Sequence, residues 1–490
     1  MSANFTTSEP TVAAPAGVEA NGINVIADSE RKGEPRDLFW PWFGANVSVF
    51  GLGYGAFILG FGVSFWQALI AGIIGIVASF LLCGLVAIAG KRGSAPTLVM
   101  SRAAFGVNGN KLPSFVSWVL TVGWETALVV LATLGTRTVF QTLGWGGGTA
   151  TSVVALIVVA GLTVVAGVAG FDMIMRLQRW ITWVTGALTV VYIVLVAQHV
   201  DWATVAGLPS GSAQAFIGAL IFVVSGFGLG WVNAAADYSR YLPRSSSTRG
   251  VVGWTTLGGA VAPVLLVIVG LLLAGSSTEL SDAIGGDPIG ALSSLLPRWF
   301  LVLFVIVAVL GLIGGSVLDI YSSGLALLTL GLRIPRWSAA LVDGVIMVAG
   351  AIFVVFYTDN FIGPFQSFLI GLGVPVAAWA GVMIVDIAMR KSDYAEAELY
   401  DPSGRYGSVR WSAVGLVVLG TGVGWGLVTS TTAGLGWLGY LLSPFGLGGR
   451  TGDWAFANIG VIAALLIGAL GTWILGRSEI RAQERGSGGS

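Results

Sequence analysis

Two acidic residues lie deep inside long apolar segments of the chain. Glu125 follows about twelve residues of the apolar segment 113–142, and Asp319 lies about twenty residues into the segment 298–331. An ionisable side chain inside a membrane span is costly and usually serves a function. A carboxyl group withdrawn from water is suited to reversible protonation, although it can also form a simple hydrogen bond between helices. We therefore predict that Glu125 and Asp319 contact a bound ligand or a coupling proton.

Aromatic and polar side chains accompany these acids. Trp124 directly precedes Glu125, at a depth unlike that of interfacial tryptophans, and offers a flat face on which a planar ring can stack. Phe227 is expected to close the stack from the opposite side, and Asn46 and Ser48 to offer polar groups. Ordinary packing of Trp124 is the alternative. The set predicts a site for a flat, partly polar molecule.

Three glycines at alternate positions mark two of the apolar segments, at 51, 53 and 55 and again at 226, 228 and 230. Each glycine costs a helix roughly 1 kcal/mol relative to alanine. Interrupted helices survive in a bilayer only where they are buried in protein or line a wet cavity. A matched pair of interruptions in two halves of a chain is typical of a transporter's substrate site. The alternative is that the glycines let helices pack closely.

The composition places the whole chain in a membrane. Of 490 residues, 55% are hydrophobic and only 10% are charged, whereas soluble domains carry roughly 25% charged residues. A net charge of zero gives no sign of nucleic-acid binding. A single histidine (His199) and a single cysteine (Cys83) argue against a histidine or cysteine metal centre. No phosphate loop or nucleophile motif is present, so we expect neither an enzyme nor a cofactor.

About twenty apolar residues span a bilayer, and this rule predicts an all-α membrane protein. Lys and Arg are enriched in cytoplasmic loops, and an N-terminus inside places 21 of the 24 basic residues there. We therefore expect a multi-pass protein of the cytoplasmic membrane with both termini cytoplasmic. The sequence indicates no oligomeric state. The twelve predicted helices are 38–63, 66–90, 113–142, 150–170, 179–198, 213–236, 251–275, 298–331, 338–357, 362–389, 409–430 and 454–476.

The first five helices begin near residue 38 and the next five near 213, an offset that matches the spacing of the two glycine clusters. Because each group has an odd number of helices, the second group must be inverted in the membrane, which gives a five-plus-five inverted repeat. The outer loop 276–297 is expected to cap the vestibule. The predicted divisions are a disordered cytoplasmic tail (1–36), two repeats (37–200 and 201–398), helices 11 and 12 (399–476) and a cytoplasmic tail (477–490).

Five short motifs stand out along the chain, namely DYSRYLP at 237–243, GKRGSAPT at 90–97, SRAAFG at 101–106, YSSG at 321–324 and VD at 385–386. Together they resemble those of the nucleobase:cation symporter-1 family, in its purine-cytosine permease branch. The similarity extends from about residue 36 to 405 and implies a leucine-transporter-like fold with discontinuous helices 1 and 6. It also implies uptake of nucleobases or related planar heterocycles, driven by sodium or protons.

The resemblance also implies roles for individual residues. The stacking tryptophan of helix 3 falls on Trp124, the polar residue of helix 1 on Ser48, and the helix 8 amide position on Asp319, which is an acid here. A polar residue expected one turn after the tryptophan is Leu128. The helix 6 aromatic falls on Gly228 in a rigid alignment, and the neighbouring Phe227 is the proposed substitute.

The position of the sodium site known from sodium-coupled relatives offers few oxygen ligands in this chain. In sodium-coupled relatives, helix 1 carbonyls and two helix 8 hydroxyls hold the ion. Gly44 and Val47 still offer the carbonyls, but the helix 8 pair is Ile313 and Gly314, which carry no hydroxyl. With Glu125 and Asp319 available, we favour proton coupling over sodium.

The resulting hypothesis is a secondary active transporter that imports a nucleobase, cytosine or a purine, by alternating access. One alternative keeps the fold but changes the substrate to allantoin, a hydantoin or thiamine, or the coupling ion to sodium. A different class of alternative is a passive channel or a transporter-like sensor.

Overall fold

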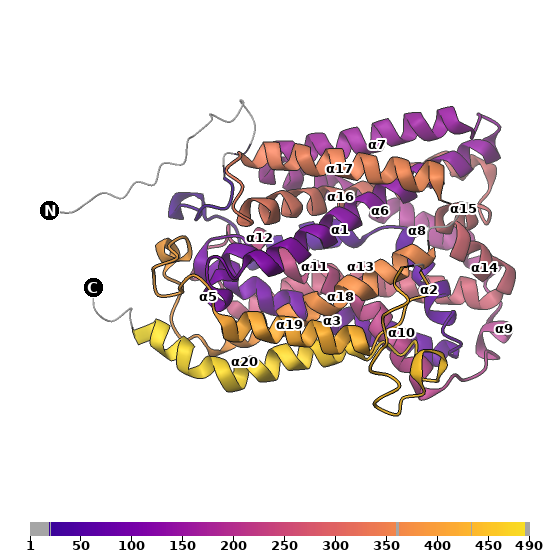
Figure 1. The fold of residues 1–490 in the computed structure, drawn as a ribbon. Helices are drawn as coiled ribbons and strands as arrows, with labels where there is room; N and C mark the ends of the chain where they lie inside the picture. Colours follow the sequence, from indigo (N-terminus) through magenta and orange to yellow (C-terminus); the bar gives the residue numbers. More distant parts are fainter. Residues whose placement is uncertain (1–18, 20, 359–361, 433, 486–490) are drawn as a thin grey trace.

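The computed structural model describes residues 19, 21–358, 362–432 and 434–485. Every regular element in these ranges is a helix. The long helices run side by side between the two ends of the molecule, and the short helices α9 (Trp202–Ala206), α14 (Thr278–Gly286) and α15 (Pro288–Ser293) lie together at one end (Figure 1). This arrangement confirms the predicted all-α membrane class.

Ten helices of the described chain are long and apolar enough to cross a membrane, and a pair bent by 68° adds one more. The 16-residue α19 is shorter but also apolar. Each predicted helix thus has a counterpart. The spans in order are α1 with α2 (Phe39–Asn46, Phe50–Leu59), α3 (Phe65–Gly93), α6 (Lys111–Leu143), α7 (Thr149–Ala169), α8 (Phe171–Val196), α10 with α11 and α12 (Ala213–Gly226, Gly228–Trp231, Ala235–Ser239), α13 (Thr248–Ser276), α16 (Leu301–Thr329), α17 (Arg336–Tyr357), α18 (Ile362–Met389), α19 (Trp411–Gly426) and α20 (Gly460–Arg485).

The helices form two packing groups. In the first, which we call the bundle, α13 packs on α1, α2 and α3, and α10 to α12 pack on α3. In the second, the scaffold, α6, α7, α16 and α17 pack on one another. Helix α8 joins the groups through α1 and α16, while α20 packs on α18 and α19 outside them. The five-helix repeats therefore interleave, because each contributes helices to both groups.

Both predicted interruptions exist, but the first lies elsewhere. In the second repeat α10 ends at Gly226, and Phe227 has φ −115° and ψ −115°, so the glycine cluster does coincide with the break. In the first repeat the break falls at residues 47–49, and the glycines at 51, 53 and 55 are helical residues of α2. These glycines act in packing: a Cβ on Gly55 would overlap the backbone of Gly270 in α13. The alternative of close helix packing is therefore correct for this cluster.

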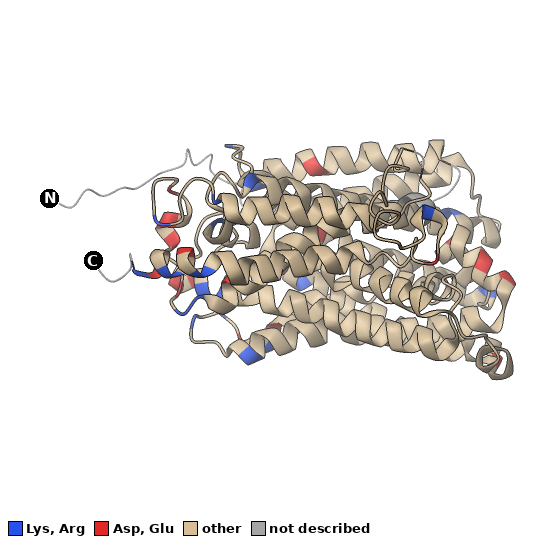
Figure 2. Ribbon diagram, turned by 60° about the horizontal axis from the view of Figure 1, so that its bottom comes forward, with Lys and Arg blue, Asp and Glu red and all other residues tan. Residues whose placement is uncertain are grey.

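Charged residues gather at one end of the molecule (Figure 2). We call this end, which carries most of the Lys and Arg residues, the basic end. The charge rule for membrane proteins predicts that it faces the cytoplasm. Helix α20 runs out to Arg485 at this end, so the predicted tail from residue 477 is helical up to that point.

Of the predicted disordered tail 1–36, the structure describes Glu19 and residues 21–36, and several of these side chains pack on the basic end. Ile26 is 1% exposed, and Arg31 donates hydrogen bonds to Leu242 O and Lys91 O. The Glu19 carboxylate accepts hydrogen bonds from Tyr321 Oη (3.2 Å) and Phe171 N (2.8 Å). A low-hydrophobicity sequence thus becomes ordered by binding charged and backbone groups of several helices.

The contact between α2 and α13 gives a prediction about stability. Gly55→Ala forces a methyl group against the Gly270 backbone, which cannot move aside like a side chain. We expect a loss of about 1–3 kcal/mol, typical of overpacking, seen as a lower melting temperature of the purified protein. Gly161→Ala in α7 is the matched control, since a Cβ there meets nothing within 4 Å. Equal melting temperatures for the two variants would contradict the role of this contact.

Candidate functional site

The interruption of the second repeat has its freed backbone groups satisfied by neighbouring helices. Tyr54 Oη donates a hydrogen bond to Gly226 O at 3.2 Å, and Gly228 N donates to Ser79 Oγ at 3.0 Å. Backbone polar groups inside a bilayer need such partners, because no water is available there. Gly228 is thereby held against α3, with its Cα facing the Ser79 backbone. Its role is to pack the break, and it does not line the cavity described below.

The interruption of the first repeat rests on glycines of α16. The last backbone hydrogen bond of α1 runs from Val47 N to Phe43 O. In the interruption that follows, Ser48 Oγ accepts a hydrogen bond from Phe50 N at 3.3 Å. A Cβ on Gly314 would lie 2.7 Å from Gly44 O, and one on Gly311 would lie 2.9 Å from Val47 O. The two carbonyls named by the ion-site prediction therefore face α16 at positions where only glycine fits.

A small cavity lies between the two interruptions. Its volume is about 50 Å³. Ligand pockets usually measure roughly 300–1,000 Å³, so admission of a heterocycle requires its walls to move apart. The walls come from α1, α2, α6, α10, α11 and α16. Its aromatic lining residues are Phe50, Tyr54, Trp124, Phe227 and Trp231, and its polar ones are Asn46 and Ser48.

Trp124 lines this cavity and carries an unused hydrogen-bond donor on the side of its ring that faces Gly230. Its Nε1 is buried and has no partner among the described residues. The indole lies against α11, since a Cβ on Gly230 would be 3.1 Å from Nε1. Phe365 and Phe368 of α18 pack on it edge-on, with ring centroids 5.3 and 6.4 Å away. A rigidly held ring with a free N–H is suited to bind a planar ligand that carries an acceptor.

A larger cavity of about 700 Å³ opens at the end of the molecule opposite the basic end. Asp282 of α14 lines it, together with Gln214 of α10 and Asp453 of the segment before α20. The segment 276–297 thus contributes to the wall of this larger cavity, which we call the vestibule. Phe57 separates the two cavities: it lines the vestibule and contacts Tyr54 and Phe50 at centroid distances of 5.7 and 6.2 Å.

The two predicted acids are buried behind the cavity wall. Glu125 is 0% exposed and Asp319 is 1% exposed, and none of their four carboxyl oxygens has a hydrogen-bond partner among the described residues. Neither lines the small cavity. Asp343 of α17 lies close enough to Glu125 for the two carboxyl groups to repel each other when ionised. Asp343 is held by Trp118 Nε1 at 2.8 Å and Ser323 Oγ at 2.9 Å.

A glutamine occupies the place where the ion was expected. Gln178 of α8 donates a hydrogen bond from Nε2 to Gly314 O at 2.6 Å. The amide nitrogen must face that carbonyl, since two oxygens at this distance would repel. Gln178 Oε1 and Thr182 Oγ1 point toward Gly44 and have no described hydrogen-bond partner. The glutamine side chain therefore fastens α8 to α16 beside the first interruption.

Residues 25–443 match the family described as "Permease for cytosine/purines, uracil, thiamine, allantoin". The chain belongs to this family. The permease is 26% identical over 409 residues to the putative purine-cytosine permease YxlA of Bacillus subtilis, covering 80% of this chain and 84% of that one. It is 25% identical over 280 residues to the purine-cytosine permease FCY21 of Saccharomyces cerevisiae, covering 54% and 49%.

Solved structures confirm the fold. Mhp1, a nucleobase-cation-symport-1 family transporter in a closed conformation with bromovinylhydantoin bound, superposes with a TM-score of 0.69 at 18% identity, covering 94% of this chain and 98% of that one. Its inward-facing conformation gives a TM-score of 0.66 at 18% identity, covering 96% and 98%. The leucine-transporter-like fold with discontinuous helices 1 and 6, expected from the resemblance, is therefore shown.

Sequence reasoning selected four residues that line the small cavity, namely Asn46, Ser48, Trp124 and Phe227. It overlooked the lining aromatics Tyr54 and Trp231, although both stand inside or directly after the glycine clusters, which was a usable signal. It did not select Asp343, which the structure buries in the third turn of α17. Gln178 gave no signal, since its importance arises only from contact with Gly314.

Proposed function

We propose that this permease imports a nucleobase, cytosine or a purine, across the cytoplasmic membrane by proton-coupled alternating access. The observation that carries the proposal is the aromatic cavity between the two helix interruptions, where Trp124 offers a flat face and a free N–H donor. Nucleobases are flat and carry ring acceptors, so both features match them. The basic end then faces the cytoplasm, and the 700 Å³ vestibule receives substrate from outside.

Stacking is assigned to Trp124 and Phe227, and recognition of the ring edge to Asn46 and Ser48. Asn46 ends α1 and Ser48 lies inside the first interruption, so their positions depend on the backbone that opens there. Leu128 lines the same cavity and replaces the polar residue expected from the resemblance. That difference favours a substrate that makes one less polar contact with α6. Competition for uptake among cytosine, adenine, allantoin and a hydantoin identifies this substrate.

Proton coupling is preferred to sodium coupling for two reasons. A hydroxyl side chain at position 314 has no room, because its Cβ would meet Gly44 O at 2.7 Å, and Gly314 O is already bonded to Gln178. Glu125 and Asp319 are buried carboxyl groups without partners, and an ionised group in such a place is expensive unless it is paired. Each is therefore suited to carry a proton.

Alternating access requires the bundle to move against the scaffold. At the basic end the two groups are tied together through Glu19: its carboxylate lies 3.6 Å from Arg240 of the segment after α12 and 3.5 Å from Arg336 of α17. Both arginines are buried. Opening toward the basic end has to break this bridge, so we assign Glu19 to the closed state of that end.

Removal of the stacking face should weaken substrate binding. Base–aromatic stacking contributes about 1–3 kcal/mol, so Trp124→Ala is expected to raise the Kd of the transported base about 5- to 150-fold. Trp124→Phe keeps a flat ring and should lose less. Trp180→Ala, which removes a tryptophan 72% exposed on α8, is the control for general damage. Binding to purified protein measures all three, and equal affinity in Trp124→Ala and wild type would remove Trp124 from the site.

Removal of a protonatable group should separate binding from coupling. Glu125→Gln keeps the shape of the side chain but cannot carry the proton, so accumulation driven by a pH gradient should be lost while exchange of labelled for unlabelled substrate persists. Glu279→Gln in α14 serves as the control acid. Vesicles with a pH gradient, assayed with and without sodium, provide the measurement. Full gradient-driven accumulation by Glu125→Gln would exclude its role, and dependence on sodium would exclude proton coupling.

Weakening the Glu19 bridge should favour opening toward the basic end. Glu19→Gln leaves Arg240 and Arg336 buried without their anion, and the loss of one partner of a buried pair is strongly destabilising. We expect faster labelling, from the basic side, of a cysteine placed at Ser322 in a Cys83→Ala background. Glu30→Gln, which alters an exposed acid of the same segment, should label like the parent. Identical rates for Glu19→Gln and Glu30→Gln would show that the bridge does not govern opening.

A further inference from the structure

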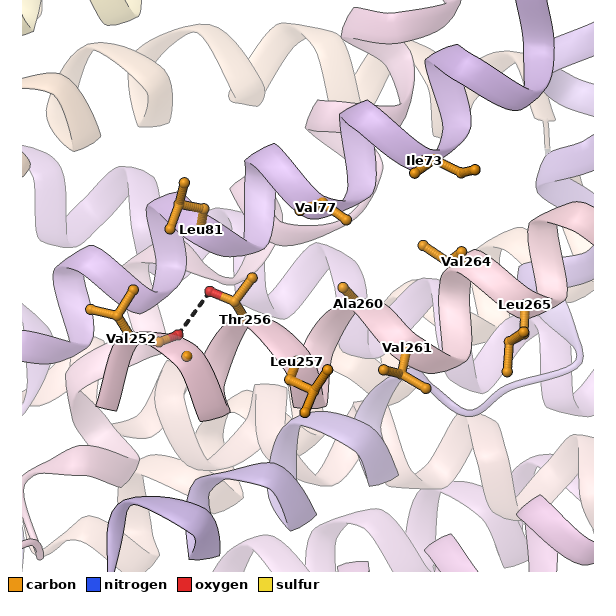
Figure 3. Close-up of a pocket in the computed structure, with 11 residues that line it drawn as sticks. Ile73, Val77, Leu81, Val252, Thr256, Leu257, Ala260, Val261, Val264 and Leu265 are labelled. Atoms are coloured by element: carbon orange, nitrogen blue, oxygen red, sulfur yellow. Dashed lines mark hydrogen bonds between the residues drawn. The ribbon is translucent and has the colours of Figure 1, made fainter. Parts of the chain in front are cut away.

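A groove of about 520 Å³ lies on the outer surface of the bundle, between α3 and α13 (Figure 3). The two helices touch at both of its ends. A Cβ on Gly84 would lie 2.8 Å from Val252 O, and one on Gly72 would lie 3.0 Å from Val267 Cγ1. Between these contacts the helices part, and the side chains of Ile73, Val77, Leu81, Leu257 and Leu265 are 37–57% exposed.

The groove offers almost nothing but hydrocarbon. Thr256 carries its only side-chain hydroxyl, which already donates to Val252 O at 2.8 Å. Its α13 wall runs from Val252 to Leu265, a length of about 20 Å at 1.5 Å per residue. One leaflet of the hydrocarbon core is about 15 Å thick, and the groove's volume is in the range of ligand pockets. These dimensions fit an extended acyl chain of a membrane lipid.

A positively charged side chain, Arg249, lies on the same face of α13, at the basic end of the groove. Arg249 precedes Val252 and Gly253 by three and four residues and Thr256 by seven, so it lies on the groove's face of α13, one turn beyond its end. It is exposed and has no ion pair or hydrogen bond from its side chain within the described chain. Long basic side chains near helix ends reach the headgroup region.

Neighbouring basic residues are already engaged, which distinguishes Arg249. Arg244 pairs with Glu396, and Arg92 pairs with Asp393 at 3.3 Å. Lys91 donates to Ser246 O at 2.9 Å. Trp254, 38% exposed, stands beside the groove in the position typical of an interfacial tryptophan.

We propose that this groove binds an anionic phospholipid of the leaflet at the basic end. One acyl chain lies along the α3–α13 groove, and the phosphate pairs with Arg249. The site is separate from the substrate cavity, and it is independent of which substrate or coupling ion the permease uses. Because α3 and α13 both belong to the bundle, the bound lipid moves with the bundle as one body.

The test compares two lipids on the full-length purified protein. Phosphatidylglycerol and phosphatidylcholine with identical acyl chains are added to detergent-solubilised protein, and the melting temperature is recorded. We expect phosphatidylglycerol to raise it more. Arg249→Gln should reduce the phosphatidylglycerol effect to that of phosphatidylcholine, while Arg333→Gln, which changes another exposed arginine at the basic end, should preserve the difference.

A second pair of variants tests the groove itself. A side chain at Gly253 projects into open space, so Gly253→Phe fills the groove without a clash, and Gly161→Phe on α7 is the matched control with equal space. Loss of the lipid effect in Gly253→Phe alone supports the proposal. Equal stabilisation by both lipids, or a phosphatidylglycerol preference retained by Arg249→Gln or by Gly253→Phe, overturns it. The purified protein could also prove to be a dimer that Gly253→Phe separates into monomers while the lipid effects stay unchanged. That result overturns the proposal, since the groove would then be the interface between two copies of the chain.

Discussion

The fold of this permease depends on satisfying backbone groups where two membrane helices stop. In the bilayer interior each unpaired N–H or C=O costs several kcal/mol. The second interruption meets this demand through Tyr54 and Ser79, which come from α2 and α3 of the first repeat. The first interruption rests its carbonyls on the glycines of α16 in the second repeat. Each half of the molecule therefore packs on the broken helix of the other: the second break gains hydrogen bonds, and the first gains close packing against glycine.

This reciprocity also builds the candidate substrate cavity. Tyr54 is both the hydrogen-bond partner of Gly226 and a wall of the cavity, with its ring 4.4 Å from that of Phe227. A movement of α2 that widened the cavity would strain the hydrogen bond from Tyr54 to Gly226 O, which stabilises the break between α10 and α11. In the proposed transport cycle, substrate entry into this cavity would therefore require the helices around the break to rearrange. The small cavity volume is consistent with a site whose walls separate only when the bundle moves.

Much of the fold could be predicted from the sequence because its signals are long and repetitive. Apolar length, the positions of Lys and Arg, and the 175-residue offset between glycine clusters depend on many residues at once. The exact position of the first break could not be predicted, because glycine both weakens helices and permits close packing. At Gly55 the contact with Gly270 decides for packing. The packing of Glu19 and of residues 21–36 was missed because this stretch is polar and its partners lie far away in sequence.

The candidate site was predictable where a residue type is anomalous for its depth, as with Trp124, Glu125 and Asp319. It was not predictable where the meaning depends on a partner. Gln178 is an ordinary residue of an amphipathic helix until α16 brings Gly314 O within 2.6 Å of its amide. Asp343 likewise gains significance only from the proximity of Glu125.

The position of the acids behind the cavity wall bears on how protonation can drive transport. Asp319 is on the scaffold helix α16, next to Leu318, whose carbonyl accepts a hydrogen bond from Tyr238 of the bundle at 3.2 Å. In the proposed transport cycle, a shift of the bundle against the scaffold would break this contact beside Asp319. A proton held there would thus stabilise one arrangement of the two groups without touching the substrate. Since neither acid lines the small cavity, the proposed proton coupling would act through the positions of the helices and not through contact with the substrate.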